Sequence, residues 1–249
     1  MNLIKKIYTH LVWRAGYILK FTLPQFFLSC FLKKRVKTGP FAGMRYIRRS
    51  VGSVVLPKLI GTYENELSEI FQKISHSNYT CFIDIGAAEG FYAVGIKKYI
   101  LTGTDRVIAF EASKKGRKLI RKIARLNNVH GIVVKGFCDT AALNSVLGNG
   151  CTFILSDIEG GEYNLLDPDV SNFCNCDLLV EMHHNKGRNK EEIFIKKFSG
   201  THNIIPIAQQ VKNLPVNISW HPLIKKYGNY AVNEFRESTS WLFLQRKTQ

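Results

Sequence analysis

The sequence predicts an α/β protein built on a mainly parallel sheet with helices on both faces. From Tyr79 onward, apolar runs of strand length alternate regularly with segments whose apolar residues recur at helical spacing. Such alternation is typical of parallel sheets, because each crossover helix packs back on the sheet. The chain has 249 residues and is 45% hydrophobic, which is enough to fill the core of one large domain.

The apolar runs define seven expected strands, and the helical patterns between them define five expected helices. The strands are Thr80–Ile85, Arg106–Glu111, Gly131–Lys135, Thr152–Asp157, Asp177–His183, Thr201–Ala208 and Ser240–Arg246. The helices are Phe91–Leu101, Lys114–Leu126, Thr140–Leu147, Glu162–Leu166 and Asn189–Phe198. Ligands of open parallel sheets bind beyond the C-terminal ends of the strands, so the residues that follow each strand are the candidates for a site.

A basic amphipathic N-terminal arm, residues 1–38, precedes the predicted domain of residues 39–249. Residues 1–50 contain eleven Lys and Arg and no Asp or Glu, so this N-terminal part of the chain contributes +11 of the net charge of +16. Its longest uncharged run, Phe21 to Leu32, has 12 residues, which is short of the roughly 20 that span a bilayer. This composition favours contact of residues 1–35 with an anionic membrane surface; a helix packed on the domain by its aromatic face is the alternative.

The stretch CFIDIGAAEGFYAVGI predicts a strand that ends near Asp84, a tight turn through Gly86 and Gly90, and then a helix. Such a turn lets backbone N–H groups approach a ligand closely. It lacks the Gly-Lys-Ser/Thr ending of a phosphate-binding P-loop and the spacing G-x-G-x-x-G of dinucleotide folds. An acidic residue in the turn, Glu89, would also oppose a pyrophosphate. S-adenosylmethionine suits the turn better, because it carries an ammonium and a sulfonium and no phosphate.

A second anchor for a nucleotide-like ligand is Glu111, which ends VIAFE 25 residues beyond Gly86. A carboxylate at this strand end can accept hydrogen bonds from both ribose hydroxyls. The alternative is a carboxylate that simply begins the following helix. The glycine turn and Glu111 follow consecutive strands of one strand–helix–strand unit, and together they favour the ligand-binding interpretation.

A third segment, ILSDIEGGEYNLLD, makes a family resemblance specific. The chain resembles the FkbM-like family of class I S-adenosylmethionine-dependent methyltransferases: FIDIGAAEGFYAV is similar to the first motif, VIAFEAS to the second, and DIEGGEYNLL to the Asp-x-Glu-Gly-x-Glu-x-x-x-Leu segment. The likeness extends from about Gly61 to Met182. It implies a Rossmann-like, mostly parallel seven-stranded sheet whose last hairpin is antiparallel, with Ser240–Arg246 as the inserted strand.

The resemblance also implies O-methylation of a sugar or related hydroxyl, with S-adenosyl-L-methionine as the methyl donor. The cofactor-binding residues that it implies are Asp84, Gly86, Ala87, Gly90, Glu111 and Asp139. Asp139 would hold the adenine amino group, although capping of the helix that begins at Thr140 is an equally good interpretation. Ala88 departs from the pattern, because many class I methyltransferases carry a glycine there.

The expected catalytic residues are Asp157, His183 and Glu159. A sugar hydroxyl is a weak nucleophile at neutral pH, so a positioned base would assist the transfer. Of the adjacent His183 and His184, at most one faces the acceptor, and Glu181 shares the parity of His183 and could orient it. A packed or solvent-facing loop histidine is the alternative. We assign no metal ligands, and a divalent cation at Asp157, Glu159 and His183 is a less favoured option.

The sequence therefore predicts an O-methyltransferase whose acceptor is a hydroxyl of a saccharide or glycolipid. Six scattered cysteines, several within apolar runs, indicate a reducing compartment, so we expect a cytoplasmic enzyme on the inner face of the membrane. One alternative is an RNA methyltransferase, which the net charge invites. The basic residues of the arm stand among aliphatic and aromatic residues, and an Asp-Pro-Pro-Tyr-type tetrapeptide is absent, so nucleic acid is an unexpected partner. The other is a binding protein with this fold and no turnover.

Overall fold

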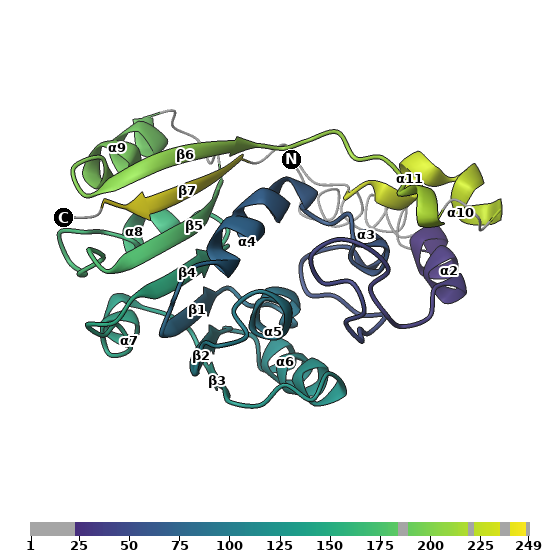
Figure 1. The fold of residues 1–249 in the computed structure, drawn as a ribbon, viewed down its shortest axis with the longest axis horizontal. Helices are drawn as coiled ribbons and strands as arrows, with labels where there is room; N and C mark the ends of the chain where they lie inside the picture. The colour runs from purple at the N-terminus through teal and green to yellow at the C-terminus, as the bar shows by residue number, and fades with distance from the viewer. Residues whose placement is uncertain (1–22, 184–188, 219–221, 235–239, 248–249) are drawn as a thin grey trace, which may run out of the picture.

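The computed structural model describes residues 23–183, 189–218, 222–234 and 240–247. Within them, seven strands form one sheet in the order β3-β2-β1-β4-β5-β7-β6 (Figure 1). The strands are β1 Cys81–Ile85, β2 Arg106–Phe110, β3 Ile132–Lys135, β4 Thr152–Ser156, β5 Cys176–Met182, β6 His202–Ala208 and β7 Ser240–Arg246. The first five pair in parallel, and β7 lies antiparallel between β5 and β6. The predicted fold class is confirmed, including the inserted last strand.

The order of the strands reverses between β1 and β4. The chain builds β2 and β3 on one side of β1, then returns to build β4 and β5 on the other side. At such a reversal the connections leave in opposite directions, and a crevice opens beyond the C-terminal ends of the two strands. The turn after β1 and the turn after β4 therefore meet in one place.

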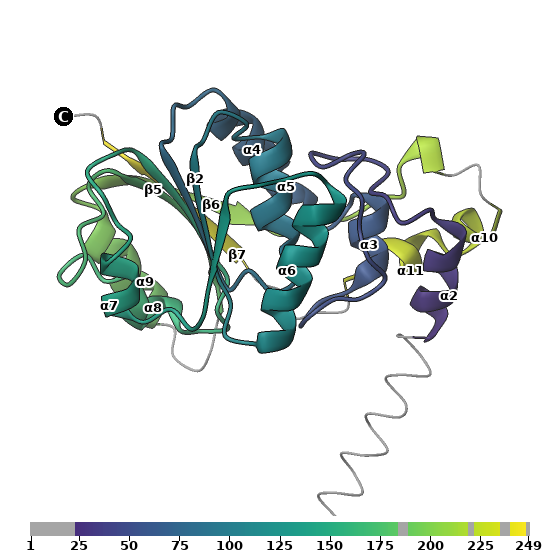
Figure 2. The ribbon, with the colours of Figure 1, turned by 90° about the horizontal axis from the view of Figure 1, so that it is seen from below.

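Helices cover both faces of the sheet. Figure 2 shows α4, α5 and α6 on one side of the sheet and α7, α8 and α9 on the other. The bounds are α4 Ser68–Ser75, α5 Phe91–Tyr99, α6 Lys114–Leu126, α7 Thr140–Asn144, α8 Glu162–Leu165 and α9 Asn189–Phe198. Successive residues of β1 alternate between the two cores: Phe82 stacks on Phe153 at a ring-centroid distance of 5.6 Å, whereas Ile83 packs in the core that contains Leu143 of α7. Both faces are thus buried, as a parallel sheet requires.

A further group of short helices lies outside the layer of α4 to α6 (Figure 2). It joins N-terminal segments to the insertion between β6 and β7, and Gln25 Nε2 donates a hydrogen bond to the Asn233 carbonyl oxygen at 3.1 Å. The members are α2 Leu23–Phe31, α3 Val55–Ile60, α10 Pro222–Lys226 and α11 Gly228–Val232, with the 3₁₀ turns η2 Asn65–Leu67 and η3 Val216–Ile218 nearby in the chain. These short elements were not predicted.

The described part of the arm packs on the domain. Leu28, Leu32 and Val36 are buried in the same core as β1 and α5. The backbone N–H of Val36 donates to the Met44 carbonyl oxygen at 2.9 Å. Residues 1–22 of the predicted arm lie outside the described residues, and the boundary at residue 38 stays a prediction. In the part of the chain that the structure describes, none of the helices combines the length and the apolar character needed to cross a membrane.

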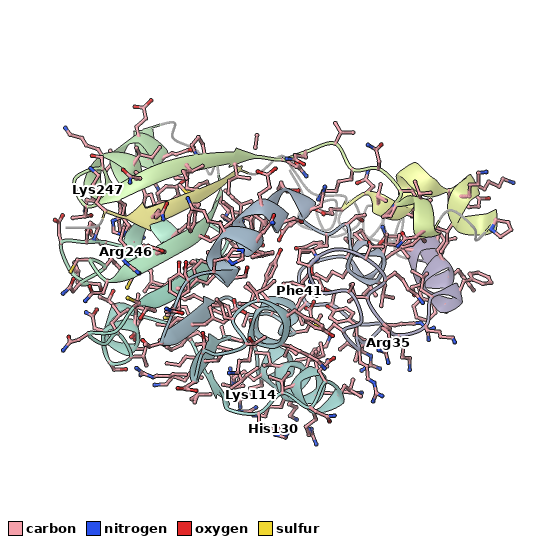
Figure 3. All side chains as sticks on the ribbon, viewed as in Figure 1. Arg35, Phe41, Lys114, His130, Arg246 and Lys247 are labelled. Carbon is pink, nitrogen blue, oxygen red and sulfur yellow. The ribbon has the colours of Figure 1, made fainter. Side chains whose placement is uncertain are left out.

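Phe41, labelled in Figure 3, fixes the N-terminal segment to α4 and α5. Its ring centroid lies 5.6 Å from that of Phe71 and 5.2 Å from that of Phe91. Gly95 of α5 makes room for it, since a Cβ there would lie only 2.8 Å from the Phe41 ring. The segment that follows Phe41 is thereby held beside the turn after β1.

Candidate functional site

A cleft of about 1130 Å³ opens at the C-terminal edge of the sheet, where the strand order reverses. Pockets for one small molecule usually measure about 300–1,000 Å³, so this cleft can hold a cofactor and part of an acceptor. The predicted residues that line it are Gly86, Ala87, Glu111, Asp139, Asp157, Glu159 and His183. Asp84 and Gly90 are not among the described residues that line it. Residues 51–54 and Glu234 also line the cleft, and neither was predicted from the sequence.

The turn after β1 depends on residues with left-handed backbone conformation. Gly86 has a φ of 84°, and a Cβ there would lie 1.9 Å from the Asp157 carbonyl oxygen. Gly90 has a φ of 91° and precedes α5. Ala88, at the position where the family pattern has a glycine, has a φ of 49°. A left-handed alanine costs about 1–2 kcal/mol, which explains the preference for glycine at this position and shows that a methyl group fits there.

Glu111 is held directly beneath that turn. Its Oε2 accepts a hydrogen bond from the Ala88 N–H at 2.9 Å, and its Oε1 accepts one from the Ser113 N–H at 2.7 Å. The N-cap of α6 is Ser113, whose hydroxyl accepts from the Gly116 N–H. The carboxylate of Glu111 is thus fixed in direction at the cleft, with lone pairs left for further donors.

Asp139 caps α7, because its Oδ1 accepts a hydrogen bond from the Ala142 N–H at 2.7 Å. This hydrogen bond confirms the capping interpretation. Asp139 also lines the cleft, and its contact with a cofactor stays a prediction. Asp84 lies deeper, with 1% of its surface exposed. Burial raises the pKa of Asp84 to about 7, and its carboxyl group accepts a backbone hydrogen bond from Ala93 of α5.

The acidic residue in the turn, Glu89, is fully buried and paired with Lys58. The Lys58 Nζ lies 2.6 Å from Glu89 Oε1, and the Val51 N–H donates to Oε2 at 2.7 Å. The hydroxyls of Tyr46 and Ser50 donate to the same carboxylate. Burial alone would raise the pKa of Glu89, but the attraction of Lys58 outweighs it and the pKa is lowered. The expectation that Glu89 would repel a pyrophosphate is therefore wrong, because Lys58 neutralises the charge of Glu89.

The lack of a free cation among the described residues that line the cleft nevertheless argues against a phosphate ligand. Lys58 is the one Lys or Arg among the described residues that line the cleft, and its Nζ is already bound to Glu89. Pyrophosphate sites rely on free backbone N–H groups and cations. The sequence could not show the pairing, because Lys58 precedes Glu89 by 31 residues and belongs to no recognised motif.

A histidine and four carboxyl groups meet at the other end of the cleft. His183 Nε2 lies 3.6 Å from Asp157 Oδ1, 3.5 Å from Glu159 Oε2 and 3.6 Å from Glu181 Oε2. On the other side of the ring, Nδ1 lies 3.2 Å from Glu162 Oε1. The structure thus brings the three predicted catalytic residues together. His184 lies outside the described residues.

The pKa of both central groups, Asp157 and His183, is raised, but for different reasons. Burial, followed by the carboxyl group of Glu181, raises the pKa of Asp157 well above its ordinary value. Burial alone would lower the pKa of His183, but Glu162 and the other carboxylates around the ring outweigh burial and raise it. The cluster therefore holds protons that isolated carboxylates would release.

The local backbone explains this convergence. Asp157 follows β4 and its N–H donates to the Ile85 carbonyl oxygen at 3.0 Å, which joins it to β1. Glu159 has a φ of 57°, a strained conformation typical of functional turns. Glu162 closes the turn, because its Oε1 accepts a hydrogen bond from the Ile158 N–H at 2.7 Å. Glu162 is also the first residue of α8, where the predicted helix begins, and its side chain lies beside His183.

Comparisons with known proteins identify the fold. No protein-family model matches the chain, and no curated protein matches it. The ribosomal protein L11 methylase from Lactobacillus delbrueckii subsp. bulgaricus superposes with a TM-score of 0.50 and 14% identity, over 82% of this chain and 84% of that one. For the precorrin-6y C5,15-methyltransferase from Geobacter metallireducens GS-15, the TM-score is 0.46 and the identity 11%, over 76% of this chain and 91% of that one. The chain has the Rossmann-like fold of class I S-adenosylmethionine-dependent methyltransferases.

Proposed function

We propose that the protein is an FkbM-like methyltransferase that transfers a methyl group from S-adenosylmethionine to a hydroxyl of a saccharide or glycolipid. The observation that carries this proposal is the division of the cleft into two chemically different ends. A glycine turn with a fixed carboxylate forms one end, and a cluster of carboxyl groups around His183 forms the other.

The turn end suits the methyl donor. Glu111 offers acceptor oxygens for ribose hydroxyls, and Gly86 and Ala87 line the same end of the cleft. S-adenosylmethionine has no phosphate, and its cationic groups are compatible with a cleft that has no unpaired Lys or Arg among its described residues.

The acidic end suits a neutral acceptor that carries hydroxyl groups. Asp157, Glu159 and Glu181 can accept hydrogen bonds from hydroxyls, whereas they would repel the phosphates of RNA. Bound S-adenosylmethionine would supply an activated methyl group for the acceptor oxygen, and Asp157 or His183 would accept the proton of the hydroxyl. The protein aligns the two reactants and excludes water, which supplies most of the catalysis in such transfers.

We also propose that the enzyme works on the cytoplasmic face of a membrane, through α2. Phe26, Phe27 and Phe31 on its outer side are 49%, 62% and 50% exposed, while Leu28 is buried. The exposed Lys33 and the basic residues that follow lie directly after this helix. Aromatic rings beside Lys and Arg are typical of segments that bind the interface of anionic membranes.

The decisive experiment incubates the protein with methyl-labelled S-adenosylmethionine and an extract of the cells that express it. The products are then separated into glycolipid, polysaccharide, RNA, protein and small-molecule fractions. We expect the label in a glycan or glycolipid, its loss with Asp157→Asn, and its retention with Asp169→Asn, which removes an exposed carboxylate that does not line the cleft. Label in RNA would overturn the proposal in favour of an RNA methyltransferase.

The membrane contact is tested with liposomes. We expect the double substitution Phe26→Ser and Phe27→Ser to release the protein from liposomes that contain phosphatidylglycerol. Val211→Ser, which removes an apolar side chain that is 88% exposed, is the matched control. Deletion of residues 1–35 is less suitable, because it would also remove Leu28 from the core. Equal binding of the double variant and the control would place the contact elsewhere.

A further inference from the structure

We propose that Asp157, Glu159 and His183 bind a divalent metal cation at the acidic end of the cleft. One ligand atom from each residue lies within 4.8 Å of the other two. Two of the residues come from the turn after β4 and the third from the end of β5, and these strands are hydrogen-bonded neighbours. The sheet therefore fixes the spacing between the two sources of ligands.

The distances are those of neighbouring ligands on one ion. His183 Nε2 lies 3.6 Å from Asp157 Oδ1 and 3.5 Å from Glu159 Oε2. A good N–H···O hydrogen bond spans about 2.7–3.2 Å, so neither pair is hydrogen-bonded well. Two ligands that each lie about 2.1 Å from a tetrahedral ion are about 3.4 Å apart. Glu159 is 83% exposed, so its side chain can rotate to complete the site.

An independent observation comes from Glu162. Its side chain is 0% exposed and its Oε1 lies 3.2 Å from His183 Nδ1. A carboxylate on this side of the ring leaves Nε2 facing the other acidic residues, as in metal sites whose histidine is oriented from behind. The second oxygen, Glu162 Oε2, has no hydrogen-bond partner among the described residues, and the same holds for Asp157 Oδ1. A cation between Asp157, Glu159 and His183 Nε2 would give the buried Asp157 Oδ1 a partner and would offset the negative charge gathered there.

The donor set indicates the class of metal. One imidazole nitrogen with carboxylate oxygens suits Mn²⁺ or Zn²⁺, whereas Mg²⁺ and Ca²⁺ prefer oxygen ligands alone. Glu181 Oε2, 3.6 Å from the same nitrogen, is close enough to join the coordination shell. A cation here would also hold the acceptor oxygen beside the methyl donor; this use, unlike the binding itself, rests on the proposed function.

The test uses the full chain and Mn²⁺ alone. Electron paramagnetic resonance measures free Mn²⁺ during a titration, and pulsed measurements detect coupling of bound Mn²⁺ to an imidazole ¹⁴N. We expect one bound ion per chain with ¹⁴N coupling, and a loss of affinity of about tenfold or more in Glu159→Gln and in His183→Gln. Asp169→Asn should bind like the unmodified protein. Glu159→Gln alters an exposed side chain, so it tests the site without disturbing the core.

Three results would overturn the proposal. They are no binding at millimolar Mn²⁺, an affinity for Mn²⁺ in both site variants equal to that of the unmodified protein, or bound Mn²⁺ without ¹⁴N coupling. The titration contains neither S-adenosylmethionine nor an acceptor. Its outcome is therefore separate from that of the labelling experiment, and the methyltransferase proposal can stand if the metal proposal falls.

Discussion

Asp84 should make the stability of the folded protein depend on pH, and Asp84→Asn should remove this dependence. The side chain is 1% exposed, and its Oδ2 has no hydrogen-bond partner among the described residues. Burial is the largest influence and, with the nearby Glu111 and Glu89, raises the pKa from 3.8 to about 7. A backbone hydrogen bond from Ala93 and the charge of Lys58 oppose the rise without cancelling it.

The sign follows from proton binding. Between about pH 4 and pH 7, the folded protein keeps a proton on Asp84 that the unfolded chain has released. The free energy of unfolding therefore falls as pH rises through this window, by about 1.4 kcal/mol per pH unit and about 4 kcal/mol in all. Between about pH 5.5 and about pH 8.5 the free energy of unfolding falls by only about 2 kcal/mol, because the part of the fall below pH 5.5 has already taken place. Asparagine has no proton to release.

The assay is urea unfolding followed by circular dichroism at about pH 5.5, 7.0 and 8.5. We expect the difference in free energy of unfolding between Asp84→Asn and the unmodified protein to grow in favour of the variant by about 2 kcal/mol over this range. Asp105→Asn, which removes an exposed carboxylate, controls for the loss of one negative charge. A difference that stays constant from pH 5.5 to 8.5 would refute the reasoning, because Asp84 would then not change its charge there.

Three other substitutions test the cofactor end of the cleft. Glu111→Gln should weaken S-adenosylmethionine binding by about tenfold or more in isothermal titration calorimetry, because a charged acceptor for the ribose is lost; unchanged affinity would remove the ribose assignment. Lys58→Met should destabilise the fold by about 3–5 kcal/mol in urea unfolding, since Glu89 stays buried without its counter-ion, and the added Glu89→Gln should restore most of the loss. Ala88→Gly relieves a left-handed alanine but gives the unfolded chain more freedom, so stability should change by less than about 1 kcal/mol with cofactor affinity retained.

The sheet and its flanking helices could be predicted because each carries a local periodic signal. The observed α6 and β7 match the predicted bounds, and α7 ends at Asn144, three residues early. The short helices α2, α3, α10 and α11 have five to nine residues, too few for a helical period to stand out from the sequence. Their stability comes from packing against each other across the length of the chain, which sequence patterns do not reveal.

The site was predictable where its residues follow strands. Asp157, Glu159 and His183 come after β4 and β5, so strand order alone brings them together. Glu181 was expected from its parity with His183. Glu234 was not expected, because it lies in the insertion before β7, where its Oε1 accepts a hydrogen bond from the Glu64 N–H at 2.8 Å. Contacts of this kind depend on where an insertion returns in space.

The close packing of Gly86 on the Asp157 carbonyl oxygen puts the two ends of the cleft in direct backbone contact. The turn after β1, which would face the methyl donor, touches the turn after β4, which carries Asp157 and Glu159. Binding of the donor and binding of the acceptor are therefore coupled, because a shift of one turn on binding displaces the groups of the other turn. Effects of substitutions at Asp157 will accordingly be felt in the affinity for the donor as well as in turnover.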